Sequence, residues 1–211
     1  MLIKRIFRIL KNHFQNYFLY YFILSLGLIL GIIIGSLLIN SFSFNTKLFI
    51  LKVSNPYYKV ALLSDNLNHS IMRASILSNI YLILLIYLIS VLNIGLFIMP
   101  FILLIKGMLL GFTVGFLVNS FGLKGFLLSI GGIYPQNIFI ISGLIGLGAV
   151  TMSLSKMVRR PLANPMLQHG SRKSNESLLL TAIYSFIIIF GAIIEGIISH
   201  RFLSFTLDFF V

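Results

Sequence analysis

The sequence predicts an all-α fold, a polytopic membrane helical bundle of about five transmembrane helices with the N-terminus in and the C-terminus out. Three observations favour this class. Of the 211 residues, 58% are hydrophobic and 9% are charged, whereas a soluble domain carries about 25% charged residues. The apolar residues gather in runs that reach the roughly 20 residues needed for a membrane-crossing helix. Lys and Arg flank these runs, as in membrane proteins with a defined orientation.

Residues 1–16 form a basic amphipathic segment that we expect on the cytoplasmic side, with Lys4, Arg5, Arg8 and Lys11 between apolar residues. The first span is predicted at about 17–40. A cleaved signal peptide has a shorter apolar core followed by a small-residue cleavage site. This run is longer and has no convincing site of that kind, so we expect a retained membrane helix.

The next apolar run, 76–118, is long enough for two crossings. The sequence Asn-Ile-Gly at 93–95 is a turn signal, and Pro100 follows shortly after it. We therefore predict the second and third spans at about 76–93 and 96–119.

A fourth span is predicted at about 126–151, and a fifth at about 178–199. The fourth is interrupted by Gly131-Gly132 and Pro135, which leaves a kinked crossing and a re-entrant segment both open. The spans and their connections form a single integral-membrane domain over 17–211, with an outer loop at about 41–75 and a basic cytoplasmic loop at about 152–177.

The orientation follows from the distribution of Lys and Arg, which are more frequent in cytoplasmic loops. With the N-terminus inside, the inner segments carry nine of them: Lys4, Arg5, Arg8, Lys11, Lys156, Arg159, Arg160, Arg172 and Lys173. The outer segments carry six over more residues: Lys47, Lys52, Lys59, Arg73, Lys124 and Arg201. This bias predicts an inner N-terminus and an outer C-terminus.

The formal net charge of +12 indicates a partner of negative charge. Because the basic residues flank apolar spans, we expect that partner to be the anionic headgroups of the lipid bilayer, and no nucleic acid.

Recognisable catalytic motifs are missing from the sequence. It has no Cys, no H-E-x-x-H zinc motif and no phosphate-binding G-x-x-x-x-G-K-[ST] loop. The four histidines fall in predicted loops or at helix ends, away from carboxylates at ligand spacing: His13, His69, His169 and His200. We therefore predict no catalytic residue, no cofactor and no metal site, and a protein that is not an enzyme.

Two glycine ladders with the same four-residue spacing lie inside apolar runs. One is Gly27, Gly31 and Gly35, and the other is Gly107, Gly111 and Gly115. Helices in lipid associate without a hydrophobic driving force, so small residues that allow close backbone approach mark packing faces. Each ladder predicts such a face. The sequence leaves open whether the facing helix belongs to this chain or to a second copy in a homodimer.

Two ionisable residues, Lys106 and Glu195, fall inside predicted spans, where charged side chains are costly and mark functional sites. Three interpretations stay open for Lys106: an ion pair with Glu195, snorkelling of its ammonium group towards the cytoplasm, and a site for a transported solute. If the turn lies at Asn93 the residue is close to mid-bilayer, and if it lies nearer Pro100 snorkelling is favoured.

Three segments together resemble the stage II sporulation protein M family of endospore-forming bacteria. The first reads K-G-M-L-L-G-F-T-V-G-F-L-V-N and runs from Lys106 to Asn119. It is followed by G-L-K-G-F-L-L-S and by Y-P-Q-N, which contains Pro135, Gln136 and Asn137. The resemblance covers essentially the whole chain and is most specific over 106–137.

The resemblance implies a non-enzymatic membrane scaffold in the cell membrane, on the mother-cell side of the sporulation septum. Such a scaffold recruits and localises two peptidoglycan hydrolases, stage II sporulation proteins D and P, for septal wall thinning and engulfment during endospore formation. The alternative from the residues alone is a membrane transporter or permease subunit that moves a small solute or lipid past Lys106 and the interrupted fourth span.

Overall fold

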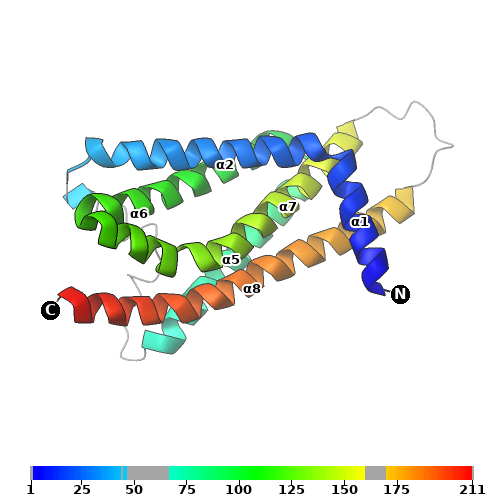
Figure 1. Cartoon of the computed structure of the whole chain (residues 1–211). Coiled ribbons are helices and arrows are strands. Elements are labelled where there is room, and N and C mark those ends of the chain that lie inside the picture. Colours follow the sequence, from blue (N-terminus) through cyan, green and yellow to red (C-terminus); the bar gives the residue numbers. More distant parts are fainter. Residues whose placement is uncertain (1, 44, 47–66, 160–169, 211) are drawn as a thin grey trace.

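The computed structural model describes residues 2–43, 45–46, 67–159 and 170–210, and within these ranges the regular structure is helical, with no strand. The helices form one elongated bundle, and the two ends of the chain lie at its opposite ends (Figure 1). In chain order the elements are α1 (Leu2–Asn16), α2 (Phe18–Leu38), the 3-10 turn η1 (Ile39–Ser41), α5 (Leu67–Val91), α6 (Gly95–Gly132), α7 (Tyr134–Arg159) and α8 (Gly170–Phe210).

Five helices within the described residues are long and apolar enough to cross a membrane. Their spans are Phe18–Leu38, Met72–Val91, Gly95–Ser120, Tyr134–Lys156 and Asn175–Ile198. The all-α fold and the number of spans predicted from the sequence are thereby confirmed.

Helix α1 lies across the end of the bundle, at a steep angle to α2 (Figure 1). Its basic side chains Lys4, Arg5, Arg8 and Lys11 are exposed, whereas His13 on the opposite face is buried. A basic amphipathic helix set at a large angle to the spans is the arrangement expected for a helix that lies in the membrane interface.

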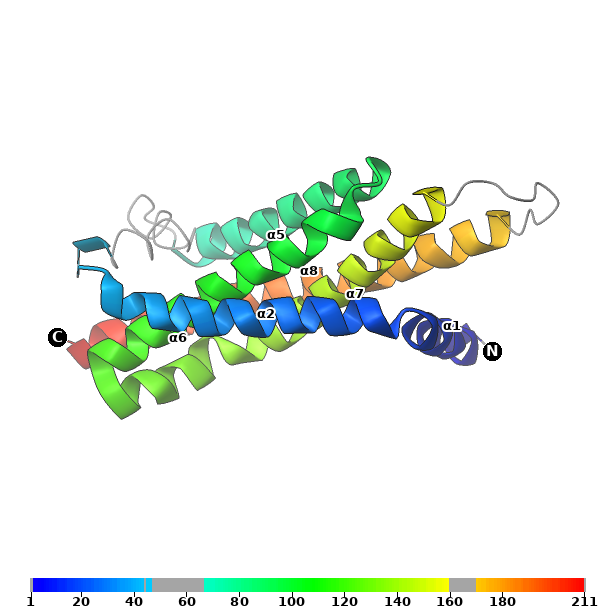
Figure 2. The same cartoon turned by 90° about the horizontal axis from the view of Figure 1, so that it is seen from above.

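The turn between α5 and α6 lies where the sequence places it. Asn93 has a positive φ of 57° and α6 begins at Gly95. Pro100 lies inside α6, in its second turn, so the helix starts before the proline. From this turn α5 and α6 diverge towards the other end of the bundle (Figure 2).

The fourth span differs from the predicted range of 126–151. Helix α6 reverses at Gly122, whose φ of 58° and ψ of −134° are accessible to glycine and strained for other residues. After the reversal the chain packs back on itself, because a Cβ on Gly125 would overlap the carbonyl of Leu117. Residues 123–132 therefore form a returning arm, and the span itself begins at Tyr134. The predicted interruption corresponds to the break between this arm and α7.

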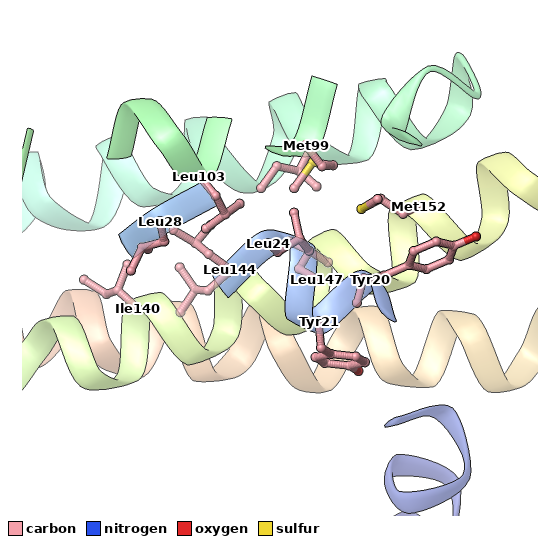
Figure 3. Close-up of a cluster of buried hydrophobic side chains, with 13 residues drawn as sticks. Tyr20, Tyr21, Leu24, Leu28, Met99, Leu103, Ile140, Leu144, Leu147 and Met152 are labelled. Atoms are coloured by element: carbon pink, nitrogen blue, oxygen red, sulfur yellow. The ribbon is translucent and has the colours of Figure 1, made fainter. Parts of the chain in front are cut away.

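Helix α7 lies at the centre of the bundle. Over an apolar stretch of 18 residues within its span, 67% of the residues are buried, against 22–28% for the corresponding stretches of the other four spans. The main core joins Tyr21, Leu24 and Leu28 of α2 to Leu103 of α6 and to Leu144 of α7 (Figure 3). The outward faces of the other spans carry large exposed apolar side chains, which a lipid environment would cover.

The two predicted loops are shorter in the structure. Helix α5 already begins at Leu67, within the outer loop predicted at 41–75. Helices α7 and α8 extend to Arg159 and from Gly170, within the cytoplasmic loop predicted at 152–177. The remaining parts of both loops, 47–66 and 160–169, lie outside the described residues.

Candidate functional site

The two glycine ladders lie against each other along the interface between α2 and α6. We call this interface the glycine seam, formed by Gly27, Gly31 and Gly35 of α2 with Gly107, Gly111 and Gly115 of α6. A Cβ on Gly31 would overlap the carbonyl oxygen of Leu104, and a Cβ on Gly111 would overlap that of Ile32. Each ladder thus accommodates the backbone of the other helix. The two helices run parallel, since facing residue numbers rise together.

The seam is tightest in its middle. A Cβ on Gly35 would lie 2.8 Å from the Cα of Met108, closer than real Cβ contacts. At the two ends the space is larger: a Cβ on Gly27 would lie 3.3 Å from the carbonyl oxygen of Pro100, and one on Gly115 would meet its nearest atom at 3.2 Å. The facing partner that the sequence left open is therefore in the same chain.

Glu195 on α8 is held by α5. Its Oε2 atom accepts a hydrogen bond from the Asn79 amide at 3.1 Å and lies 2.8 Å from the Ser75 hydroxyl, which is also 2.9 Å from the carbonyl of Ala192. Both α5 side chains are buried. Among the described residues no ion pair joins Glu195 to Lys106, so the structure does not bring together the two candidates for an intramembrane ion pair.

Lys106 lies on α6 directly beside Gly107 of the seam, and its side chain is half-buried. Its ammonium group makes no hydrogen bond or ion pair with any side chain in the described ranges. Its neighbours towards the outside of the helix, Ile105 and Phe101, are 55% and 68% exposed.

The polar residues of the family-like motif lie at the start of α7. Pro135 occupies its first turn, where the missing N–H has no helical partner to lose. Gln136 is 4% exposed, and its amide nitrogen donates to the backbone carbonyl four residues earlier. Its Oε1 atom is buried and has no partner among the described residues. Asn137 donates to a backbone carbonyl at 2.7 Å, and Asn119 is exposed near the reversal of α6.

Gln136 and Glu195 share one level of the bundle. Helices α7 and α8 run antiparallel, and a Cβ on Gly191 would lie 3.1 Å from the backbone nitrogen of Ile140. Gln136 lies one helical turn before Ile140, and Glu195 lies one helical turn after Gly191. Because the two helices are antiparallel, both residues lie one turn from the same contact, at the same level and on the facing sides of the helices. We call these two residues and the two α5 side chains that contact Glu195 the polar layer.

A second polar cluster, which the sequence does not reveal, joins α1 to three spans. His13 Nδ1 lies 3.0 Å from the Tyr21 hydroxyl, and this hydroxyl lies 3.0 Å from that of Tyr184. On the other side of the ring, Nε2 lies 3.4 Å from Ser153 Oγ. Because the Ser153 hydroxyl donates to the carbonyl of Val150, it accepts from His13 Nε2–H.

The donors and acceptors of this cluster then form one continuous chain. With the proton on Nε2, Nδ1 accepts from the Tyr21 hydroxyl, which accepts in turn from the Tyr184 hydroxyl. Burial lowers the pKa of His13 to about 4, so the ring is neutral at pH 7. The sequence indicates the burial of His13 only through its position, because His13 shares the apolar face of α1 with Ile6 and Leu10.

Glycines along α7 allow this helix to lie at the centre of the bundle. Their spacing forms no ladder, so the sequence does not mark them. A Cβ on Gly146 would overlap the ring of Tyr184 on α8. On another side of the helix, a Cβ on Gly148 would lie 2.8 Å from the Met99 side chain of α6 and 2.9 Å from that of Leu24 of α2. Helix α7 therefore presents close-packing faces to three helices.

Within the described residues, no group of three or more His, Cys, Asp or Glu side chains could hold a metal ion. The two polar clusters instead join helices to one another, through neutral groups and one carboxylate.

A comparison with protein families matches residues 16–200 to the family described as stage II sporulation protein M. The chain belongs to this family. The match covers all five spans and begins at the last residue of α1. No curated protein and no solved structure matches the chain. Membership in the stage II sporulation protein M family, together with the five apolar helices, makes this chain a sporulation-related integral membrane protein.

Proposed function

We propose that this chain is a non-enzymatic scaffold in the cell membrane, on the mother-cell side of the sporulation septum. There it recruits and localises two peptidoglycan hydrolases, stage II sporulation proteins D and P, for septal wall thinning and engulfment. The observation that carries the proposal is the glycine seam. Two spans far apart in sequence pack with their backbones in direct contact, as in a protein that must present a fixed shape to partners.

Three further observations support this role. Family membership connects the chain to sporulation. The two polar clusters use their donors and acceptors to bridge helices, which stabilises the bundle. The central helix α7 packs closely against α2, α6 and α8 through small residues.

We further propose that the docking surfaces lie outside the cell, where peptidoglycan is. With the N-terminus inside, the reversal of α6 at Gly122 and the C-terminal end of α8 both fall on the outer side. These are the elements opposite α1 in the bundle (Figure 1).

The proposal is tested in sporulating cells that lack the native protein and carry fluorescent stage II sporulation proteins D and P. The wild-type chain should restore septal localisation of both hydrolases and engulfment. A Gly111→Ile variant should fail, because the side chain would overlap the backbone of Ile32. Gly131→Ile is the control, since Gly131 lies in the returning arm after the reversal at Gly122 and has no atom within 4 Å of its Cβ position.

Membrane abundance of each variant is measured by immunoblot, so that loss of protein and loss of recruitment are distinguished. Normal septal localisation of both hydrolases in cells without the chain would contradict the scaffold role.

The polar layer formed by Ser75, Asn79, Gln136 and Glu195 is the one observation that favours a transporter or permease subunit, since polar groups inside spans also mark solute pathways. Flux of small solutes or labelled lipids into proteoliposomes distinguishes the two functions. Flux that Glu195→Leu abolishes, with hydrolase localisation unchanged, would favour the transporter.

A further inference from the structure

Lys106 lies close to the middle of the apolar span Gly95–Ser120, far from the cytoplasmic end of α6. Helix α6 begins at Gly95, before Pro100, and Lys106 follows eleven residues later (106 − 95). At 1.5 Å per residue this places its Cα about 16 Å along a span, close to the middle of a hydrocarbon core of about 30 Å. Snorkelling, which a turn nearer Pro100 would have favoured, is therefore the weaker explanation.

The chain itself offers Lys106 no counter-charge in the described residues. The carboxylate of Glu195 also lies inside a span, but it accepts from Asn79 and lies beside Ser75 on α5. A second copy of the chain would offer the same carboxylate, and there too it would be hydrogen-bonded by the α5 side chains. The glycine seam, occupied from both sides, is also unavailable to a second copy.

Beside Lys106, helix α6 has a face that no described part of the chain covers. Phe101, Ile105 and Leu109 are 68%, 55% and 37% exposed. Thr113, two turns beyond Lys106, donates its hydroxyl to the carbonyl of Leu109 and is only partly covered. A half-buried ammonium group thus borders a lipid-facing apolar surface.

We infer that this face of α6 docks a transmembrane helix of another protein, and that the helix carries a carboxylate near its middle which pairs with Lys106. Charge complementarity decides the occupant: an ammonium group in hydrocarbon is strongly stabilised by a buried carboxylate, and the part of the chain that the structure describes has none available for it. The inference rests on the proposed scaffold function and specifies how one partner is recognised within the membrane.

The test uses the full chain reconstituted in vesicles of phosphatidylcholine, which has no net charge. Because the sequence has no Cys, a single Leu123→Cys substitution at an exposed site gives one position for a donor dye. The probes are synthetic helices of leucine and alanine with an acceptor dye and with Glu, Gln or Leu at the central position. Energy transfer measures their association with the chain.

We expect the Glu helix to bind about tenfold more tightly than the Leu helix, near the upper range of measured interhelical polar contacts, with the Gln helix in between. Lys106→Met and Lys106→Gln should each remove the preference for Glu. Lys124→Met is the matched control, because it removes one positive charge outside the apolar span Gly95–Ser120. A Lys106→Glu variant should instead prefer a helix with a central Lys, which restores the pair with reversed charges.

Equal binding of the Glu and Leu helices to the wild-type chain would overturn the inference. So would a Glu preference that survives Lys106→Met, or Lys106-dependent energy transfer between two labelled copies of the chain without any probe helix. Because the vesicles contain no hydrolase, such a failure leaves the septal localisation experiment to decide the scaffold role by itself.

Discussion

His13 joins four helices through groups that are all neutral. Its two ring nitrogens contact Tyr21 of α2 and Ser153 of α7, and Tyr21 extends the chain of hydrogen bonds to Tyr184 of α8. Each hydroxyl has one proton to donate, so the direction of the chain is fixed by the Ser153 bond to a backbone carbonyl. A second proton on the imidazole would make Nδ1 a donor, so that the Tyr21 hydroxyl would accept from it and donate to the Tyr184 hydroxyl instead.

The pKa of His13 predicts a pH dependence. It is lowered by burial from the ordinary value of 6.5 to about 4. Between pH 6.5 and about 4, His13 binds a proton when α1 is detached or unfolded but stays neutral in the folded protein. The free energy of unfolding therefore falls as the pH falls through this window, and it levels off below about pH 4. Thermal unfolding in detergent at pH 7, 5.5 and 4.5 measures the effect.

His13→Gln is the control, because glutamine does not titrate. It should be less stable than the wild type at pH 7, and the difference between the two proteins should shrink towards pH 4. A constant difference over the whole range would show that His13 is not buried as a neutral group.

Glu195 provides a second prediction at the scale of residues. Hydrogen bonds between membrane helices average about 0.6 kcal/mol, with maxima near 1.7. Glu195→Leu and Asn79→Leu should each lower the free energy of unfolding, and the double variant should lose less than the sum because both remove the same contact. Reversible unfolding in mixed micelles gives the four free energies.

Lys106→Met provides the control cycle. Its effect on the free energy of unfolding should add to that of Glu195→Leu within about 0.5 kcal/mol, because the structure keeps the two side chains apart. A larger coupling energy would indicate an ion pair between Lys106 and Glu195, which the structure does not show.

At the scale of elements, small residues decide which helices approach one another. The seam between α2 and α6 depends on glycines at every fourth position of both helices. Helix α7 instead uses Gly143 and Gly146 towards α8 and Gly148 towards α6 and α2. This irregular spacing serves several neighbours at once, which explains why α7 is central although its sequence has no ladder.

The reversal of α6 gives a prediction that isolates backbone strain. No atom lies within 4 Å of the Cβ position of Gly122, so the cost of Gly122→Ala comes from its φ of 58° and not from a clash. We expect a loss of about 1–3 kcal/mol, measured as a lower free energy of unfolding in mixed micelles.

Gly131→Ala is the comparison for this experiment. Gly131 also has open space around its Cβ position but no positive φ, so alanine should stabilise the helix there by up to about 1 kcal/mol. Equal effects at the two glycines would contradict the geometry of the reversal.

At the scale of the whole molecule, the five spans in the described residues are an odd number, which predicts that the two ends of the chain lie on opposite sides of the membrane. The structure shows them at opposite ends of the bundle, with α1 across one of these ends (Figure 1). The basic face of α1 would lie against anionic headgroups of the inner leaflet if the N-terminus is inside, as the distribution of Lys and Arg predicts.

Fusions to alkaline phosphatase, which is active only outside the cytoplasm, test this orientation. Fusions after Ser43 and after Phe210 should be active, and a fusion after Arg159 should be inactive. The reverse pattern would show that the N-terminus faces outward.

Much of the fold follows from local properties of the chain. The apolar runs predict the five spans, and the turn at Asn93 is visible because few residues other than Asn and Gly adopt positive φ. The start of the fourth span does not follow from local properties of the chain. Residues 126–132 and the α7 residues from Ile138 onward are both apolar, and only the packing of the returning arm against Leu117 shows that 126–132 are not part of the span.

The sequence by itself determined that this is a five-span membrane protein of the stage II sporulation protein M family, because span length, hydropathy and motifs are written residue by residue. Only the tertiary structure decided that the two glycine ladders face each other, that Glu195 is held by α5 and that Lys106 lacks a partner in the described chain. The physical reason is that apolar faces turned to lipid and apolar faces turned to protein have nearly the same composition. Hydropathy therefore places helices in the membrane, while close packing and a few polar groups choose their neighbours.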